Sequence, residues 1–585
     1  MMRKLFTFLT ILISVTVLLA QKTVLPNYST EQEKQQLQFY TPTRNVGIQS
    51  PPPGTGIRTA AEWEEMRGTV VAWEGYEDFL SEIVRYAEAE GLVYIFTSDS
   101  NSTRSTLQSN GVSLDNIRCL DQNLNSVWIR DYGANNVYVD SVGDLVFVDW
   151  IYNRNRPADD TSPEYLANYL SIPLYASTNP PTDLVNTGGN FMSDGQGNAF
   201  CSMLVMDENE ATSSFNQTPK TEAEVDAIME DYMGILSYRK MTDLPYDGIH
   251  HIDMHIKILD EQTLLVGEYP SGVADGPQIE ENLQYILDNF QTCFGTDYKV
   301  IRIPMPIGKN WGGSPAWPDN NGTYNTYTNS LIINKTILVP IYMSEETDTT
   351  AIRIYQDAMP GYNVIGIDSR DPIQASGAIH CTSHEIGVDN PLLIVHLPLE
   401  DQAASVNTYK VKANIQHRDG ISWGKVYYSI NNNTSYQSVD MVNTTGNFWE
   451  ADIPHQTEGT EIYYYVEAHA TSGKEQVRPM PAPAGYWKFK ILLGTQVNTN
   501  ITEDLNIKYY NKDGNLNIYF TSKDAQDIQI DLYNQMGAKL GTVVNTRTYH
   551  GVNQYTINTN NYAPGIYFIK VKYANQYYNE KVLIK

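Results

Sequence analysis

The chain has 585 residues, of which 41% are hydrophobic and 11% aromatic, as is typical of globular proteins. This length exceeds what one hydrophobic core can support, and we expect three or four domains. The 40 basic and 68 acidic side chains give a formal net charge of −28, which argues against nucleic acid or an anionic membrane as a partner. Such a surface attracts cationic substrates instead.

Residues 1–20 have the pattern of a secretory signal peptide. A basic start is followed by an apolar run from Leu5 to Leu19 and by a small residue at Ala20. The run is short for a spanning helix, and no later segment is apolar enough to be one. We therefore predict that residues 21–56, rich in Gln, Thr and Pro, form a propeptide or linker, and that the chain spans no membrane once the signal is removed.

Helical and strand patterns alternate from about residue 57 to 391, which predicts an α/β domain. Apolar residues share one face over Asp78–Ala89, and Thr221 with Glu224 forms a capping box before another helix. An N-cap and a first-turn proline at Ser162-Pro163 start a third helix. Further helices are predicted at 277–290 and 350–358, and strands at the sequences LVYIF and YKVIRIP.

Five polar clusters recur within this α/β region, each preceding or entering an apolar strand segment. They are anchored on Asp131, Asn190, His251, Asn329 and Cys381, at intervals of 59, 61, 78 and 52 residues. The longest interval contains the loop-like sequence PIGKNWGGSPAWPDNNGTY. Five similar modules could each deliver one polar side chain to a shared centre, although Asn190 and its glycines could also simply shape a turn.

From about residue 392 the pattern changes to alternating polar and apolar residues between turn-rich stretches. Segments such as TYKVKANIQH and EIYYYVEAHA are typical of a β-sandwich, which we predict over residues 392–494. The pattern repeats in IQIDLYNQMG and GIYFIKVKY, which predicts a second small β-sandwich over residues 495–585.

The cluster GAIHCTSHEIG, residues 377–387, raises the question of a metal site. The HE pair lacks the second histidine of a metalloprotease motif, because position 388 is Val388. His380 and Cys381 would point to opposite faces of a strand and could not easily share an ion. The sequence HHIDMH, residues 250–255, has period-two spacing that could ligate a metal. We expect no metal and no cofactor.

A cysteine nucleophile explains more of the pattern. A thiolate needs a nearby acid or base, which His251 would supply. Asp253 is two residues further on and therefore lies on the same face of the predicted strand as His251. Asp131, close to Trp128, adds a second carboxylate. Two carboxylates would repel the thiolate of Cys381 unless a cation lies between them. A guanidinium is the natural cation, since its planar fork pairs bidentately with carboxylates.

The motifs W-x-x-D, H-x-D, GGN and a late IHC resemble those of the guanidine-modifying superfamily of arginine, agmatine and peptidylarginine deiminases. The resemblance covers residues 57 to about 391. With the signal sequence and the β-sandwich that follows, the chain is similar to secreted bacterial peptidylarginine deiminases. This implies a pentein fold, an α/β propeller of five ββαβ modules around a pseudo-fivefold axis, over residues 57–391, and an immunoglobulin-like domain over residues 392–494.

The resemblance also implies catalytic roles. Cys381 would attack the guanidinium carbon, and His251 would protonate the departing ammonia and later activate water. Asp131 and Asp253 would hold the guanidinium nitrogens. Asn329 would help to set the surroundings of the cysteine.

Three more residues would contact the substrate away from the reacting carbon. Trp128 would line the arginine side chain, and Arg154 with Arg156 in YNRNRP would grip the carboxylate of a C-terminal arginine. The alternative for the two arginines is a place on the surface at the end of a strand. Asn325 lies close in sequence to Asn329 and is the other match for the asparagine position.

The sequences DLYNQMGAKL, GIYFIKVKY and EKVLIK resemble the C-terminal sorting domain of type IX secretion cargo. This implies that residues 495–585 engage the type IX secretion machinery of a Gram-negative bacterium. The protein would then be secreted or held on the outer cell surface. The alternative is an additional structural β-sandwich.

The predicted function is hydrolysis of peptidyl arginine, preferably C-terminal, to citrulline and ammonia through a covalent cysteine thiouronium, with arginine-containing proteins and peptides as partners. An agmatine or free-arginine deiminase of the same fold is the nearest alternative, although agmatine has an amine where Arg154 and Arg156 would need a carboxylate. An inactive pentein-based surface adhesin is the third, and the intact set of nucleophile, histidine and two aspartates argues against it. The other cysteines, Cys119, Cys201 and Cys293, are predicted to be buried apolar groups. The histidines His255, His380 and His384 are as often structural as functional.

Overall fold

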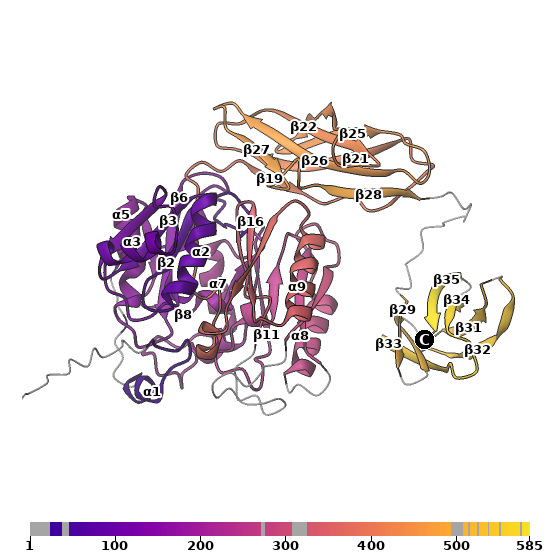
Figure 1. The fold of residues 1–585 in the computed structure, drawn as a ribbon, viewed down its shortest axis with the longest axis horizontal. Helices are drawn as coiled ribbons and strands as arrows, with labels where there is room; N and C mark the ends of the chain where they lie inside the picture. The colour runs from indigo at the N-terminus through magenta and orange to yellow at the C-terminus, as the bar shows by residue number, and fades with distance from the viewer. Residues whose placement is uncertain are drawn as a thin grey trace, which may run out of the picture. The chain divides into compact units, whose positions relative to one another are not determined.

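The computed structural model divides into two compact units, residues 1–494 and 495–585 (Figure 1). The predicted signal peptide and most of the loop at 306–324 lie outside the described residues. The described residues are 24–37, 42, 46–270, 275–306, 325–492, 507–512, 515–522, 526–535, 537–548, 551–573 and 576–584.

Five small sheets build the α/β part of the first unit, coloured indigo to magenta in Figure 1. In each sheet a central strand pairs antiparallel with one neighbour and parallel with the other: β2 with β18 and β3, β6 with β5 and β7, β10 with β9 and β11, β13 with β12 and β14, and β16 with β15 and β17. Strand β4 extends the first sheet, and β1 and β8 extend the second. The pairing pattern therefore repeats five times.

The strands of these sheets are short. They are β1 Arg58–Thr59, β2 Met66–Ala72, β3 Leu92–Thr97, β4 Ile117–Asp121, β5 Asn135–Tyr138, β6 Leu145–Tyr152, β7 Leu174–Ser177, β8 Val185–Asn186, β9 Met192–Ser193, β10 Asn198–Ser202, β11 Ser237–Met241, β12 Ile256–Ile258, β13 Thr263–Glu268, β14 Lys299–Pro304, β15 Leu331–Ile333, β16 Thr336–Ile341, β17 Asn363–Asp368 and β18 His384–Gly387. The predicted strands LVYIF and YKVIRIP are β3 and β14.

Helices join the parallel strands, because a parallel pair needs a crossover connection. The helices are α1 Glu31–Leu37, α2 Glu77–Glu90, α3 Ser100–Ser109, α4 Ile129–Tyr132, α5 Ser162–Leu170, α6 Leu204–Asp207, α7 Glu222–Met233, α8 Gly276–Asn289 and α9 Glu345–Ala358, with 3-10 turns η1 Asp159–Thr161, η2 Gly188–Asn190, η3 Ile252–Met254 and η4 Pro372–Ala375. Helix α2 buries the apolar face predicted for it, and the predicted capping box starts α7. Helix α9 begins five residues before the predicted 350. No helix in the described part of the chain is long and apolar enough to cross a membrane.

The two ends of the α/β region meet in one sheet. Strand β18 pairs antiparallel with β2, so that His384 lies opposite Val70. Asn136 strengthens this junction, because its side chain donates to Glu385 O at 2.8 Å and accepts from Gly387 N at 2.9 Å. The pairing of β18 with β2 therefore brings the residues just before β18 close to the first sheet of the domain.

The rest of the first unit is all-β, as predicted. Its strands are β19 Leu393–His396, β20 Gln402–Ala403, β21 Thr408–Gln416, β22 Ile421–Ile430, β23 Gln437–Asp440, β24 Val442–Thr445, β25 Phe448–Pro454, β26 Glu461–Ala470, β27 Glu475–Arg478 and β28 Trp487–Leu492. They form a four-stranded and a six-stranded sheet. Residues from both sheets, including Val411 and Tyr464, share one apolar cluster.

The second unit is also all-β, in agreement with the prediction. Its strands are β29 Lys508–Lys512, β30 Asn515–Ser522, β31 Asp527–Tyr533, β32 Lys539–Arg547, β33 Gly551–Asn558, β34 Gly565–Tyr573 and β35 Gln576–Ile584. They form a three-stranded and a four-stranded sheet around a common core that contains Ile518 and Val571.

The structure corrects two local predictions. The residues around His251 and Asp253 form the 3-10 turn η3, and those around His380 and Cys381 form a turn before β18, so neither pair lies on a strand. The four cysteines are unpaired, and Cys293 is exposed where a buried group was predicted. Short polar connections at strand ends hold these residues, where alternation along a strand no longer applies.

Candidate active site

Cys381 lies at the centre of a buried polar cluster. Its side chain is fully buried, in the turn that leads into β18. The amide Nδ2 of Asn329 donates to Cys381 Sγ at 3.2 Å, while Asn329 Oδ1 accepts from the backbone N of His380 at 3.1 Å. The asparagine that contacts the thiol is therefore Asn329, whereas Asn325 offers its carbonyl to Tyr269.

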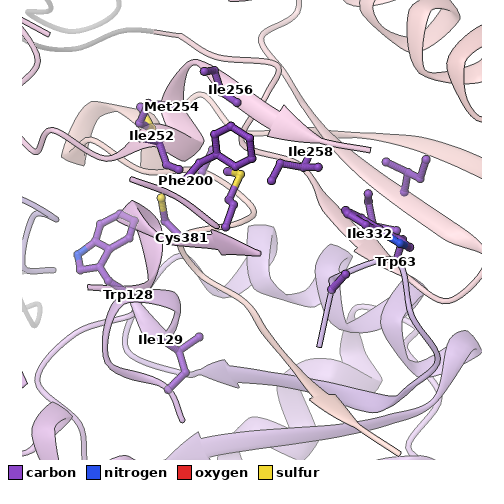
Figure 2. Close-up of a cluster of buried hydrophobic side chains, with 14 of the residues drawn as sticks. Trp63, Trp128, Ile129, Phe200, Ile252, Met254, Ile256, Ile258, Ile332 and Cys381 are labelled. Carbon is purple, nitrogen blue, oxygen red and sulfur yellow. The ribbon is translucent and has the colours of Figure 1, made fainter. Parts of the chain in front are cut away.

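Apolar side chains enclose this cysteine. Figure 2 shows its thiol beside the indole of Trp128, with Ile252 and Met254 nearby, and all belong to one buried cluster. Trp128 is the N-cap residue of α4 and is fully buried. Such surroundings exclude water and strengthen any charge interaction inside the site.

The turn at Cys381 changes the geometry expected of its neighbour. On a strand, His380 and Cys381 would point to opposite faces. In the turn, His380 Nδ1 lies 2.8 Å and Cys381 Sγ 3.5 Å from the same oxygen, Asp253 Oδ2. Both side chains therefore share one carboxylate.

The remaining polar side chains arrive from two other segments. Asp131 belongs to α4, and His251 immediately precedes η3, which contains Asp253. His251 Nδ1 lies 3.5 Å from Asp131 Oδ1, and Gly189 N donates to that same oxygen at 3.1 Å. Asn190, beside Gly189, accepts a hydrogen bond from Ser202 N at 2.8 Å, as a residue that shapes a turn does.

Several atoms in this cluster lack a hydrogen-bond partner among the described residues. They are Asp131 Oδ2, Asp253 Oδ1 and both ring nitrogens of His251. Most buried polar groups in proteins are paired, because an unpaired one costs about 1–3 kcal/mol. Two carboxylate oxygens and an imidazole without partners, next to a thiol, form a site suited to a cationic ligand with several N–H donors.

Two glycines give these groups room. A β-carbon at Gly189 would collide with His251 Nδ1 and lie 2.8 Å from Asp131 Oδ1. A β-carbon at Gly377 would collide with the Trp128 ring and lie 3.1 Å from the β-carbon of Cys381. The GGN motif thus contributes close backbone approach to the site.

Burial and like charges shift the pKa values in this site. Burial, then the charges of Asp253 and Asp131, raise the pKa of the Cys381 thiol well above its ordinary value. Burial and the Asp253 charge raise the pKa of Asp131 to about 7. Burial alone would raise the pKa of Asp253, but the hydrogen bond and charge of His380 outweigh it and lower that pKa. Burial lowers the pKa of His251 to about 3.

These shifts describe an uncharged nucleophile and an uncharged base in the free site. A thiolate here would face two carboxylates without a counter-ion. A guanidinium between Asp131 and Asp253 would supply the missing positive charge and favour ionisation of Cys381. The electrostatics therefore fit a cationic substrate better than a neutral one.

Arg154 and Arg156 are buried, and the alternative of surface arginines is wrong. Arg156 Nε lies 2.7 Å from Glu33 Oε1, and Arg154 Nε donates to Asn27 O at 2.9 Å. The indole Nε1 of Trp128 donates to Leu25 O at 2.8 Å. All three predicted substrate contacts are thus engaged by residues from the predicted propeptide.

Sequence reasoning missed two members of the cluster. His380 carried no assigned role, and Glu62 was not considered, although Glu62 Oε2 lies 3.2 Å from His380 Nε2 and 2.6 Å from Lys257 Nζ. The acidic AEWEEM stretch gives no local signal of which glutamate contacts His380. Within the described residues, no group of three or more His, Cys, Asp or Glu side chains is arranged to hold a metal ion.

Comparisons with known proteins found similar sequences and solved structures. Over 302 residues the chain is 25% identical to a Vibrio parahaemolyticus protein named "Putative agmatine deiminase", a match that covers 46% of this chain and 78% of that protein. A Legionella pneumophila protein of the same name is 23% identical over 349 residues, 57% of this chain and 96% of its own. The structure of agmatine deiminase of Enterococcus faecalis matches with a TM-score of 0.48 at 16% identity, over 58% of this chain and 99% of that one.

Two family models match the chain. Residues 496–585 match the secretion system C-terminal sorting domain, which indicates secretion or display at the cell surface. Residues 58–386 match the model of Porphyromonas-type peptidyl-arginine deiminase and contain the whole cluster around Cys381. Because this match covers more than half of the sequence, the chain belongs to the Porphyromonas-type peptidyl-arginine deiminase family.

Proposed function

We propose that the protein converts peptidyl arginine, preferably at a C-terminus, to citrulline and ammonia. The observation that carries the proposal is the convergence of Cys381, His251, Asp131 and Asp253 in one buried cluster whose inward oxygens and ring nitrogens have no partner among the described residues. Agmatine or free arginine is the second candidate substrate, favoured by the names of the relatives.

In the first half of the reaction, Asp131 and Asp253 accept hydrogen bonds from the guanidinium nitrogens. The added positive charge lets Cys381 lose its proton to the uncharged His251, and the thiolate attacks the guanidinium carbon. The tetrahedral adduct collapses when His251 returns the proton to the departing nitrogen. Ammonia leaves, and a thiouronium joins Cys381 to the substrate.

In the second half, His251 removes a proton from water, which attacks the thiouronium carbon. The carbon–sulfur bond breaks and the ureido group of citrulline forms, while the Cys381 thiolate takes back a proton from His251 and the second proton of the attacking water is released to the solvent. Water is the only other reactant. Asn329, which donates to Cys381 Sγ at 3.2 Å, stabilises the sulfur as it gains and loses negative charge.

Arg154 and Arg156 would bind the α-carboxylate of a C-terminal arginine. Two cations beside a cation-binding pocket are unfavourable unless the substrate carries its own anion. The charge of Arg154 already lowers the pKa of Asp131 against the stronger effect of burial, which indicates that this guanidinium lies close to the pocket. Agmatine, which lacks a carboxylate, could not take the place of Glu33 at Arg156.

The proposal extends to the architecture. We infer that the five sheets of residues 57–391 are the modules of a pentein propeller with Cys381 near its axis, supported by their repeated pairing pattern. Residues 392–494 would form an immunoglobulin-like domain. The sorting domain over residues 495–585, together with the signal sequence, would pass the protein to the type IX secretion machinery.

A direct test is mass spectrometry of matched peptides after incubation with the protein. Peptides with a C-terminal arginine, with the same arginine amidated and with it internal are compared with agmatine and free arginine. We expect ammonia release and the mass gain of NH replaced by O, fastest for the free C-terminal arginine. Turnover of agmatine alone would favour the second candidate, and turnover of no guanidino compound either before or after removal of residues 24–37 would refute the function.

A further inference from the structure

The predicted propeptide lies on the substrate-binding arginines. Glu33, in helix α1, is 2.7 Å from Arg156 Nε through Oε1 and 3.4 Å from Arg156 Nη2 through Oε2. These two contacts use the fork of the guanidinium as a substrate carboxylate would. Arg156 Nη2 also donates to Pro26 O at 2.6 Å. Residues 24–37 therefore occupy the anion site proposed for a C-terminal arginine.

The same segment is anchored deeper in the molecule. Asn27 is fully buried, its backbone N donates to Ala375 O at 2.8 Å, and its carbonyl accepts from Arg154. Leu25 O accepts the indole N–H of Trp128, the residue beside Cys381. With the segment in place, Cys381 and His251 have no exposed surface. A peptide approaching over Trp128 and the two arginines would meet residues 25–33 first.

Local structure alone cannot hold this segment. Helix α1 has seven residues, fewer than an isolated helix needs to be stable in water. Its exposed face carries Glu31, paired with Lys34, and such surface pairs add little. The Glu33–Arg156 pair is buried at both ends, so that removing either partner would leave an uncompensated buried charge. The position of the segment therefore depends on the site that it covers.

We propose that residues 24–37 are an autoinhibitory segment, with Glu33 as a stand-in for the substrate carboxylate. Peptides reach Cys381 only after the segment has been released, for example by cleavage between residues 37 and 46. This inference rests on the proposed function for its substrate, but the occlusion of Cys381 can be measured without turnover.

The experiment uses the full exported chain with a specific protease site placed between residues 37 and 46. Iodoacetamide labelling of the Cys381 peptide is followed by mass spectrometry before and after cleavage, with peptide deimination measured in parallel. Glu33→Gln removes the charge of the stand-in, and Glu31→Gln is the matched control on the exposed face of α1. Thermal unfolding checks that each variant is folded.

We expect cleavage to accelerate labelling of Cys381 at least tenfold, Glu33→Gln to accelerate it severalfold and Glu31→Gln to leave it unchanged. Deimination of C-terminal arginine should rise in the same order. Equal labelling rates before and after cleavage, with the segment removed by gel filtration, would overturn the inference. Faster labelling without deimination of any guanidino compound would instead refute the proposed function and leave the occlusion standing.

A separate observation concerns a buried chain of charges behind the site. Lys257 Nζ contacts both oxygens of Glu62, at 2.7 and 2.6 Å, and Glu62 Oε2 lies 3.2 Å from His380 Nε2. His380 Nδ1 then lies 2.8 Å from Asp253 Oδ2. Ile332 N donates to Glu62 Oε1 at 2.7 Å and fixes the start of the chain. His380 thus lies between two carboxylates, with Lys257 at the far end of the chain.

This chain determines where Asp253 points. Its Oδ2 is held by His380, so that Oδ1, which has no partner in the described part of the chain, remains available to a ligand. His380 in turn is fixed between two carboxylates and cannot rotate without losing one of them. We infer that Glu62 and His380 are positioning residues for the deimination proposed above, acting on the substrate through Asp253.

Glu62→Gln is the variant that tests this role, with Glu261→Gln as a control, since Glu261 is also buried and is paired with Arg478 at 2.9 Å. Without the charge of Glu62, His380 loses one of the two carboxylates that fix it, and Asp253 Oδ1 is held less well for the ligand. We expect kcat to fall about tenfold to a hundredfold while KM changes much less. Glu261→Gln should lower Tm only.

The readouts separate positioning from general support of the fold. Glu62→Asp, which keeps the charge, should recover part of the lost kcat. A Glu62→Gln protein with lowered Tm but unchanged kcat would show that the residue is structural. Failure of the protein to deiminate any guanidino compound after residues 24–37 have been released would refute the proposed function and this inference with it.

Discussion

Two buried histidines, one in each part of the first unit, have the same burial but different surroundings. His396, in the β-sheet region, lies 2.7 Å from Lys412 O through Nδ1 and 3.0 Å from Tyr464 Oη through Nε2. His251, in the α/β region, has no hydrogen-bond partner for either nitrogen among the described residues. Both ring nitrogens of His396 therefore have hydrogen-bond partners in the protein, whereas those of His251 are available to a ligand.

The pKa values do not separate these two residues. Burial lowers the pKa of His396 to about 4 and that of His251 to about 3. His396 and His251 differ in their hydrogen bonding. An unsatisfied buried group lowers the stability of the protein and is retained where function requires it. Missing partners alone do not mark a catalytic histidine, because both ring nitrogens of His255 also lack them; His251 in addition lies 3.5 Å from Asp131 Oδ1.

The largest expected effect is loss of turnover in Cys381→Ala, because no other side chain in the cluster can form the thiouronium. Cys201→Ala is the matched control, since Cys201 is equally buried but its thiol donates to Arg239 O, at 3.8 Å, outside the cluster. Ammonia release measures the turnover of each variant, and Tm confirms that both proteins fold. Substantial activity in the Cys381 variant would remove the mechanism.

The histidine pair provides the sharpest contrast. His251→Gln should lower kcat by about 10²–10⁴, as expected for loss of a general acid and base, with little change in Tm. His396→Gln should leave kcat unchanged and lower the free energy of unfolding by about 1–3 kcal/mol, because it disturbs two buried hydrogen bonds. Steady-state kinetics gives kcat for both variants, and denaturant unfolding gives their free energies of unfolding. Similar behaviour of the two would mean that hydrogen bonding does not distinguish their roles.

Asp131→Asn should lower kcat by about 10²–10³, because a neutral amide cannot balance the guanidinium charge. The same substitution should increase the stability of the protein at high pH. The pKa of Asp131 is raised to about 7 in the folded protein, so its contribution to stability is present at low pH and is lost as pH rises towards and through 7. Asn should therefore raise Tm at pH 8 and not at pH 4. A variant with unchanged kcat, or lower Tm at pH 8, contradicts this assignment.

The wild-type protein should also lose activity below about pH 7. Protonation of Asp131, whose pKa is about 7, removes one of the two charges that bind the guanidinium. The acid limb of kcat/KM measured on an arginine peptide reports this group directly. In Asp131→Asn this limb should disappear, and an unchanged limb would assign it to another residue.

The smallest expected effect is on the choice of substrate. Once the segment over Arg156 has been released, a peptide with a free C-terminal arginine should be turned over about tenfold to a hundredfold faster than its amide, the loss of one charge-assisted contact. Arg154→Ala and Arg156→Ala should each reduce this preference. Catalytic efficiencies on the matched peptides measure it, and equal values in the wild-type protein would exclude the carboxylate contact.

Local pattern was sufficient where local interactions decide the structure. The apolar face of α2 and the capping box of α7 are present as predicted, because each depends on residues three or four positions apart. The change to an all-β structure near residue 392 also followed from the alternation of its side chains. Pattern failed at His380–Cys381 and at His251–Asp253, where short turns at strand ends replace strands.

The sequence by itself therefore determined the elements and the kinds of chemistry available: a cysteine, a histidine and two aspartates suited to a guanidinium. Only the tertiary structure decided which partners those groups have. The contacts of Glu33 with Arg156 and of Glu62 with His380 join residues 123 and 318 positions apart. Such pairings depend on how whole sheets and segments pack, and no local periodicity encodes them.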